Sequence, residues 1–253
     1  MRLTLEAACG CHMGKIRRNN EDNFFFDGKC LEEKNTGMHN TVCMEEPLKN
    51  GLCVAVFDGM GGENFGETAS FTAARSMQQS VRTLADFFVP EKKYLERLCG
   101  QMNEAVVAQQ RLLQSPRMGT TVAALYFSSR YVYVCNVGDS RAYRLRGGEF
   151  MQLSRDHVSS RPMPPGRKAP LTQHLGIDPE EMRIEPYIAK GEVKKDDRYL
   201  LYSDGLTDML DNFAICDIML KNSDAERCVR ELIRAALEKG GRDNITVIVC
   251  MVQ

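Results

Sequence analysis

The chain has 253 residues, enough to bury a sizeable core as one large domain or two small ones. Its hydrophobic content of 43%, charged content of 26% and net charge of −1 are those of an ordinary globular protein, and they exclude a general electrostatic attraction to nucleic acid or anionic membrane. No apolar run approaches the ~20 residues that a membrane-spanning helix needs, and Glu6 makes the apolar N-terminal stretch a poor signal peptide, so we expect a cytoplasmic protein.

Strands are predicted where β-branched and aromatic residues gather in short runs. In chain order these runs are Asn23–Phe26, Leu52–Phe57, Thr120–Phe127, Tyr131–Val137, Ala142–Leu145, Tyr199–Tyr202 and Ile245–Met251. Ser128-Ser129-Arg130 and Gly147-Gly148 are typical of hairpin turns. At least part of the sheet is therefore expected to be antiparallel.

Helices are predicted from apolar residues that recur every three or four positions. The first helix carries Ala69, Ala73, Met77, Val81, Leu84 and Phe88, and the second, after a break at Pro90, carries Leu95, Leu98, Met102, Val106 and Leu113. A third is expected to begin at a capping box formed by Ser223 and Glu226 and to end at Gly240-Gly241. Antiparallel strands with helices bunched between them favour an α+β layered domain.

Two segments match neither pattern. Gly28 to Asn50 is polar and irregular, and we expect an exposed excursion between two strands. Ser159 to Pro170 contains four prolines and cannot form a helix or a central strand. Its basic residues Arg161, Arg167 and Lys168 either guide an anionic substrate or are simply solvated, and both interpretations stay open.

The cysteines do not indicate a disulfide framework, because ten of them are scattered over a long chain. Most lie among apolar residues, where a reduced cysteine behaves as a small hydrophobe. Cys9, Cys11 and His12 resemble half of a zinc site, but no second ligand pair follows at the required spacing.

Acidic residues stand at the ends of five predicted strands. Asp58, Asp139 and Asp204 follow strands, Glu21-Asp22 precedes the first strand, and Asp243 precedes the last. If these ends share one rim, the carboxylates repel one another, and Mg²⁺ or Mn²⁺ would offset the repulsion. For any single aspartate a simple Asp-Gly turn is the better explanation, but that explanation does not suit the whole set.

Glycines around Asp58 also fit an ion site, since a residue without Cβ lets a backbone carbonyl approach a cation. Two other glycine motifs do not fit. A dinucleotide fingerprint beginning at Gly59 would need glycine where Asn64 stands, and a P-loop beginning at Gly61 meets Glu67 instead of lysine.

Six motifs in order resemble the metal-dependent serine/threonine protein phosphatases, the PPM or type 2C family, and most closely its compact bacterial branch. They are RRNNED (Arg17–Asp22), VFDGMGG (Val56–Gly62), GTTVAAL (Gly119–Leu125), VGDSRAY (Val137–Tyr143), LYSDGLTD (Leu201–Asp208) and GRDNITVIV (Gly241–Val249). The resemblance implies one domain over residues 1–253. Its expected architecture is α+β, a β-sandwich of two antiparallel sheets flanked by helix pairs, with a binuclear Mn²⁺ or Mg²⁺ site at one rim.

The same resemblance implies roles for individual residues. Asp58 would bridge both ions with help from the Gly59 carbonyl, Asp204 and Asp243 would complete the first ion, and Glu21 would bind the second. Asp22 would orient the attacking water and Arg17 would hold the substrate phosphate. Asp139 and Asp208 would bind a third, weaker ion, and Ser159 to Pro170 falls where the family has a flap.

Two residues depart from the family pattern. Met60 stands where many eukaryotic relatives have a histidine proposed as general acid, and Glu63 stands where bacterial relatives usually have histidine. His157 resembles a family segment near the flap, but a structural role suits it better than catalysis.

The implied function is hydrolysis of phosphoserine and phosphothreonine in proteins, without a covalent phosphoenzyme. Expected partners are phosphorylated protein substrates and a cognate serine/threonine kinase, with no nucleic acid or membrane partner, and a monomer is expected. Two alternatives remain: a pseudophosphatase that acts as a binding module, and a metal-dependent hydrolase of another phosphoester. Retention of every acid of the metal set argues against the pseudophosphatase.

Overall fold

The computed structural model describes residues 3–49, 51–60, 65–80, 89–161, 163–164 and 168–253. Its strands form two sheets, and every strand pair is antiparallel. The first sheet has the order β3-β1-β12-β11-β8-β9, from β1 (Thr4–His12), β3 (Val42–Pro47), β8 (Arg141–Arg146), β9 (Glu149–Gln152), β11 (Arg198–Tyr202) and β12 (Ile245–Val252). The second has the order β10-β7-β6-β4-β2, from β2 (Asp22–Phe25), β4 (Leu52–Met60), β6 (Val122–Phe127), β7 (Tyr131–Val137) and β10 (Tyr187–Glu192), and the short β5 (Gly119–Thr120) pairs with β4.

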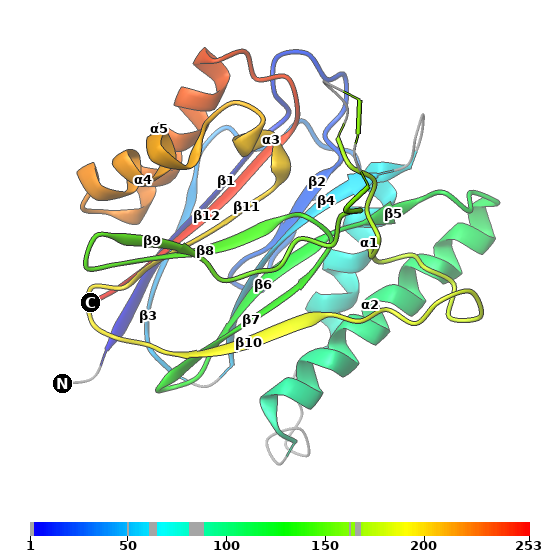
Figure 1. The fold of residues 1–253 in the computed structure, drawn as a ribbon, viewed down its shortest axis with the longest axis horizontal. Helices are drawn as coiled ribbons and strands as arrows, with labels where there is room; N and C mark the ends of the chain where they lie inside the picture. Colours follow the sequence, from blue (N-terminus) through cyan, green and yellow to red (C-terminus); the bar gives the residue numbers. More distant parts are fainter. Residues whose placement is uncertain (1–2, 50, 61–64, 81–88, 162, 165–167) are drawn as a thin grey trace.

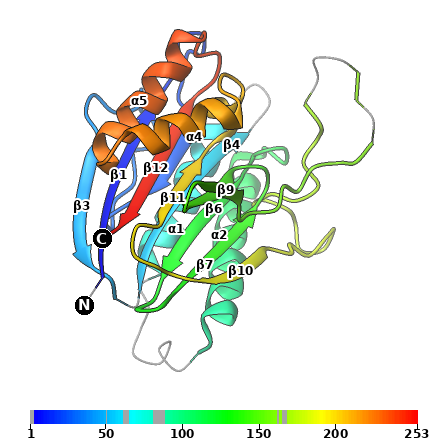
Figure 2. The same cartoon turned by 60° about the vertical axis from the view of Figure 1, so that its left-hand side comes forward.

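Helices cover the outer faces of both sheets (Figures 1 and 2). The pair α1 (Gly66–Gln79) and α2 (Glu91–Leu113) packs on the second sheet, and the pair α4 (Asn212–Lys221) and α5 (Ala225–Glu238) packs on the first. A single turn, α3 (Asp204–Thr207), follows β11. The expected α-β-β-α sandwich is therefore confirmed.

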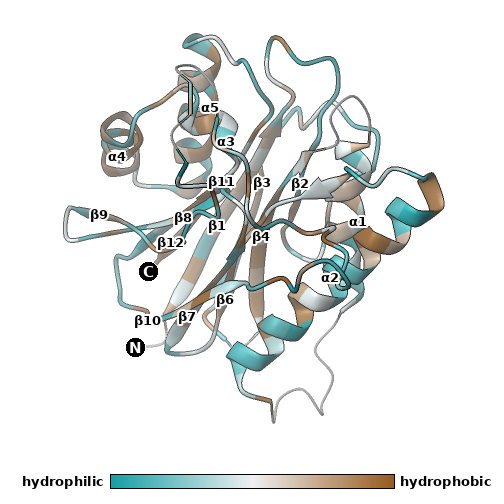
Figure 3. Cartoon of the chain, turned by 45° about the vertical axis from the view of Figure 1, so that its right-hand side comes forward, coloured by the Kyte–Doolittle hydropathy of each residue, from teal (hydrophilic) through white to brown (hydrophobic). Residues whose placement is uncertain are grey.

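Alternation along β4 shows how one strand serves two cores. Val54 and Val56 point into the layer between the sheets, whereas Ala55 and Phe57 pack with α1 and α2. Both faces of β6 and β12 are buried, so their sequences are almost continuously apolar (Figure 3). None of the helices in the described ranges combines the length and the apolar character needed to cross a membrane.

All seven predicted strands are present, and the strands missed are mostly sheet edges. β3, β9 and β10 each lie at the edge of a sheet and expose polar side chains, which hides their periodicity. The expectation that residues 28–50 form only an excursion is wrong in part, because β3 pairs with β1. β1 itself lies inside its sheet, but its alanines, cysteines and glycine have low strand propensity.

The predicted helices are present with one correction. α1 carries Ala69, Ala73 and Met77, while Val81, Leu84 and Phe88 lie outside the described residues. α2 matches its prediction. The proposed capping box of α5 is wrong: Asp224, not Ser223, is the N-cap, because its carboxylate accepts a 2.7 Å hydrogen bond from the Arg227 N–H.

Candidate metal centre

The acids at the strand ends meet at one end of the sandwich. Asp22 opens β2 directly opposite Asp58 on β4 in the antiparallel register. Asp204 begins α3 after β11, and Asp243 lies two residues before β12. The Asp58 carboxyl is close enough to the other acids for their charges to raise its pKa. The structure therefore brings together the strand ends that the sequence singled out.

Three carboxylates at this end of the sandwich form a compact group, called the acidic group below. One oxygen each of Asp204, Asp208 and Asp243 lies within 4.8 Å of the others. The helical turn of α3 places Asp208 four residues after Asp204, on the same side. At Gly205 a Cβ would lie 2.0 Å from the Asn244 carbonyl oxygen, so only glycine lets α3 pack this closely against the Asn244 backbone.

Asp58 is fixed through its backbone. Its N–H donates to Oγ1 of Thr121 at 3.0 Å, and its carbonyl accepts from the Thr121 N–H at 2.9 Å. Burial raises the pKa of the Asp58 carboxyl well above its ordinary value, and the Asp204 carboxylate raises it further. A nearby cation would stabilise the ionised form of this carboxyl group.

Gly59 joins Asp58 to the segment that carries Glu21. Its N–H donates to the Glu21 carbonyl at 3.1 Å. A Cβ at Gly59 would lie 2.1 Å from the Gly66 carbonyl oxygen and 2.5 Å from that of Glu21, so the close approach requires glycine. The pKa of the Glu21 carboxyl is raised, chiefly by burial.

Asp22 lies beneath the other acids and is 2% exposed. Ser203 Oγ donates to its carboxylate at 2.6 Å and Thr246 Oγ1 donates at 2.7 Å. Burial raises the pKa of Asp22 to about 7, although the two hydrogen bonds oppose that rise. Asp22 thus connects β2 to the ends of β11 and β12.

Asn244 is a site residue to which the sequence reasoning gave no role. Its side chain is 3% exposed and accepts a 2.8 Å hydrogen bond from the Glu21 N–H. The same amide donates to the carbonyls of Met13 at 2.8 Å and Asn19 at 3.0 Å. The signal in the sequence was an amide side chain directly before a largely apolar strand.

Arg17 lies at the exposed edge of the group. Its Nη2 donates to Oδ2 of Asp243 at 2.7 Å, while 45% of its side chain is exposed. A guanidinium has five N–H donors, so donors remain for a phosphate. This position agrees with the role implied for it.

Lys168 reaches the acids from the proline-rich segment. Its Nζ lies 2.5 Å from Oδ2 of Asp204 and 2.7 Å from Oδ2 of Asp208. Burial alone would lower the pKa of Lys168, but these two carboxylates raise it above its ordinary value. Of the other basic residues named in this segment, Arg167 lies outside the described residues, and Arg161 is exposed.

Asp139 lies close to this group without belonging to it. Burial and the Asp204 charge raise the pKa of Asp139 to about 6. Its turn is held by His157, whose N–H donates to the Gly138 carbonyl at 3.0 Å and whose Nδ1 accepts from the Gly138 N–H at 3.2 Å. His157 therefore has the structural position expected of it.

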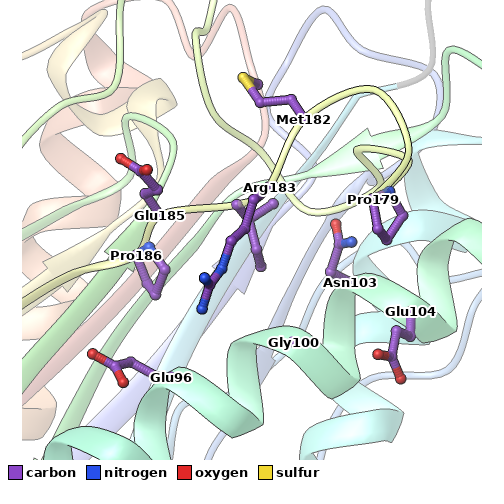
Figure 4. A pocket seen from close by; sticks show the side chains of 10 residues that line it. Glu96, Gly100, Asn103, Glu104, Pro179, Met182, Arg183, Glu185 and Pro186 are labelled. Atoms are coloured by element: carbon purple, nitrogen blue, oxygen red, sulfur yellow. The ribbon is translucent and has the colours of Figure 1, made fainter.

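A separate pocket of about 360 Å³ lies between α2 and residues 179–186. Figure 4 shows Arg183 pointing toward α2, with Glu96 and Gly100 on the helix below it. No residue of the acidic group lines this pocket, so it is distinct from the candidate metal centre.

The donor set fits hard divalent cations. Carboxylate oxygens converge from several strand ends, burial and mutual repulsion raise the pKa values of Asp58 and Asp139, and a lysine ammonium already lies between two of the carboxylates. Mg²⁺ and Mn²⁺ prefer such oxygen ligands.

Comparison with known proteins finds relatives among the protein phosphatases. The protein phosphatase 2C family model matches residues 46–245. The serine/threonine protein phosphatase PstP of Mycobacterium tuberculosis is 32% identical over 263 residues, which cover 98% of this chain and 45% of that protein. The chain thus spans about half the length of this relative.

Solved structures extend the likeness to the fold. PppA, described as a key regulatory component of T6SS in Pseudomonas aeruginosa, is 27% identical, with a TM-score of 0.78 and 98% of both chains covered. The catalytic domain of PstP in complex with two manganese ions is 28% identical, with a TM-score of 0.74 and 99% of both chains covered. From the matched family model and the identity to PstP, the chain belongs to the protein phosphatase 2C family.

Proposed function

We propose that this chain is one domain over residues 1–253 that hydrolyses phosphoserine and phosphothreonine in proteins with two Mn²⁺ or Mg²⁺ ions. The observation that carries this function is the group of Asp204, Asp208 and Asp243, with oxygens within 4.8 Å of one another and Arg17 at its edge. Carboxylates alone repel a phosphate, so this substrate needs cations at the site. A PstP structure with two manganese ions supports the same choice.

In this scheme the ions are held only by oxygen atoms. Asp58 would be a ligand of both ions, and the Gly59 carbonyl would contribute to one of them. Asp204 and Asp243 would be the remaining protein ligands of the first ion, and Glu21 would be a ligand of the second. When bound, the ions would supply an acidified water as nucleophile and would offset charge on the phosphoryl oxygens. A third, weaker ion would lie at Asp139 and Asp208, where Lys168 already contacts Asp208.

Other side chains of the protein would bind the substrate phosphate and orient the water and the metal ligands. The free N–H groups of Arg17 take two phosphate oxygens, which fixes the phosphorus for in-line attack. Asp22, whose carboxylate accepts hydrogen bonds from Ser203 and Thr246, would orient the attacking water. Asn244 fixes the backbone of Glu21, so the ligand from the N-terminal segment keeps its place.

No cysteine is needed as a nucleophile. All ten cysteines are free, and six of them are buried, including Cys9 and Cys11. Burial raises the pKa of the Cys11 thiol to about 12, which keeps it protonated and unreactive. Thiol alkylation should therefore leave turnover largely intact, provided that the core is not disturbed.

The test is hydrolysis of a phosphothreonine peptide by protein first treated with chelator. Activity should be absent, should return with Mn²⁺ or Mg²⁺, and should exceed hydrolysis of nucleotides under the same conditions. Full activity without metal would refute the mechanism. Metal binding without turnover would favour the pseudophosphatase, and preference for nucleotides would favour a hydrolase of another phosphoester. A cognate kinase and a monomeric state belong to the same proposal and need separate tests.

A further inference from the structure

Lys168 places its ammonium between two carboxylates of the acidic group. Nζ lies 2.5 Å from Asp204 Oδ2 and 2.7 Å from Asp208 Oδ2. Beside it, the Ser159 N–H donates to the Pro170 carbonyl at 2.9 Å, and the isolated bridge between Val158 and Leu171 continues this pairing. The ammonium is thus carried by a segment whose two ends are paired with each other.

Together, Lys168 and Arg17 contact every carboxylate of the group. Arg17 binds Oδ2 of Asp243 at 2.7 Å, and Lys168 binds the other two. The charge of Lys168 also opposes the rise in the pKa of Asp139. Two cations of the chain itself therefore offset much of the repulsion among these acids.

The ammonium of such an ion pair and a divalent ion compete for the same carboxylate. A carboxylate oxygen binds Mn²⁺ or Mg²⁺ at about 2.0–2.2 Å, which would place the metal only a few ångströms from an ammonium on the same oxygen. Like charges at that separation repel strongly in a half-buried site. An ion that enters at Asp204 or Asp208 must displace Lys168 or bind weakly beside it.

We propose that Lys168 limits how many divalent ions the centre holds, by keeping Asp208 in an ion pair and so preventing a third ion from binding there tightly. This inference rests on the proposed metal-dependent function. Asp204 is needed for the first ion, so Lys168 gives it up when that ion binds. Asp208 is not among the ligands of the two principal ions, and Lys168 keeps it. Lys168 is then a residue that determines metal content.

The experiment counts bound Mn²⁺ by isothermal titration and by electron paramagnetic resonance of the free ion, on the 253-residue chain stripped of metal. Lys168→Gln removes the ammonium, and Lys168→Arg keeps a positive charge. Lys221→Gln is the matched control, because Lys221 makes a similar pair with Asp217, 2.6 Å long, on α4. Asp208→Asn is combined with Lys168→Gln to locate any site that appears.

In Lys168→Gln the dissociation constant of the weakest Mn²⁺ site should be about tenfold lower than in wild type. An additional bound ion then becomes measurable. Lys168→Arg and Lys221→Gln should match wild type, and the gain should vanish in the double variant. Unchanged or weaker Mn²⁺ binding in Lys168→Gln would overturn the inference, as would a gain that survives loss of Asp208. If wild type binds no Mn²⁺, the proposed function itself fails, which is a different result.

Discussion

The side-chain carbonyl of Asn244 accepts a 2.8 Å hydrogen bond from the backbone N–H of Glu21, 223 residues earlier in the chain. With its two donated bonds, this buried amide fixes the N-terminal segment against the start of β12. The segments that would hold the two ions are thereby joined by one side chain.

Asn244→Ala should therefore lower both stability and metal affinity. Three backbone groups lose a partly buried hydrogen-bond partner, so unfolding in urea should show a loss of about 2 to 4 kcal/mol. Mn²⁺ should also bind more weakly, because the Glu21 backbone is no longer fixed. Asn212→Ala, which loses one 3.2 Å bond to the Tyr143 hydroxyl, is the control and should cost much less. Equal losses in the two variants would contradict the role of Asn244.

Asp58→Asn should abolish turnover without harming the metal-free fold. The variant loses the carboxylate that is proposed to bridge the ions, so kcat at saturating Mn²⁺ should fall below about a tenth of the wild-type value. Repulsion among the remaining acids falls, so thermal unfolding in chelator should occur at the same temperature or slightly higher. A variant with near wild-type kcat would show that Asp58 does not bridge the ions.

Metal-free protein should lose stability as the pH rises from about 4 to 7. The pKa values of Asp22, about 7, and Asp139, about 6, lie above the unfolded value of about 3.9, so the folded state holds more protons in this range. The contribution of these groups is most favourable at low pH and is lost as the pH rises through their folded pKa values.

Saturating Mn²⁺ should reverse this trend, since the ligands must be ionised. Unfolding curves at pH 5 and pH 7.5, with chelator and with Mn²⁺, test both signs; parallel trends would contradict the expectation.

Arg17→Lys should chiefly raise KM for a phosphopeptide. A lysine ammonium can replace the contact with Asp243 but not a two-pronged contact with phosphate. Steady-state kinetics would show a higher KM with a smaller change in kcat, and Arg18→Lys, on the adjacent exposed residue, is the control. Unchanged kinetics would make Arg17 a surface residue.

Gly100→Ala should stabilise the protein by roughly 1 kcal/mol. Gly100 lies inside α2, and a Cβ built there meets no atom within 4 Å (Figure 4). Alanine favours the helix by about that amount and has room. Urea unfolding measures the gain; a loss of stability would mean that the pocket beside Gly100 is tighter than the structure shows.

Strand ends and buried strands were predictable because apolar runs and acidic residues are local signals. Asp58, Asp204 and Asp243 were singled out by their positions next to such runs, the family resemblance implied one rim, and the structure brings them together. Lys168 was only one of three basic residues with two open interpretations, since its contacts with Asp204 and Asp208 join distant segments. Asn244 was missed for the same reason, and the edge strand β3 was missed because its residues are largely exposed.

The pairing of β1 with β12 has a consequence for how the chain folds. Leu5 lies opposite Val252, so an inner pair of the first sheet joins residues from nearly opposite ends of the described chain. Contacts so distant in sequence form late and slowly, because a very long loop must close first. During synthesis, the inner edge of β1 has no partner until β12 has emerged, and such an edge invites association with other chains. Asp243 and Asn244 directly precede β12, so the candidate metal centre is assembled only after β12 has joined β1.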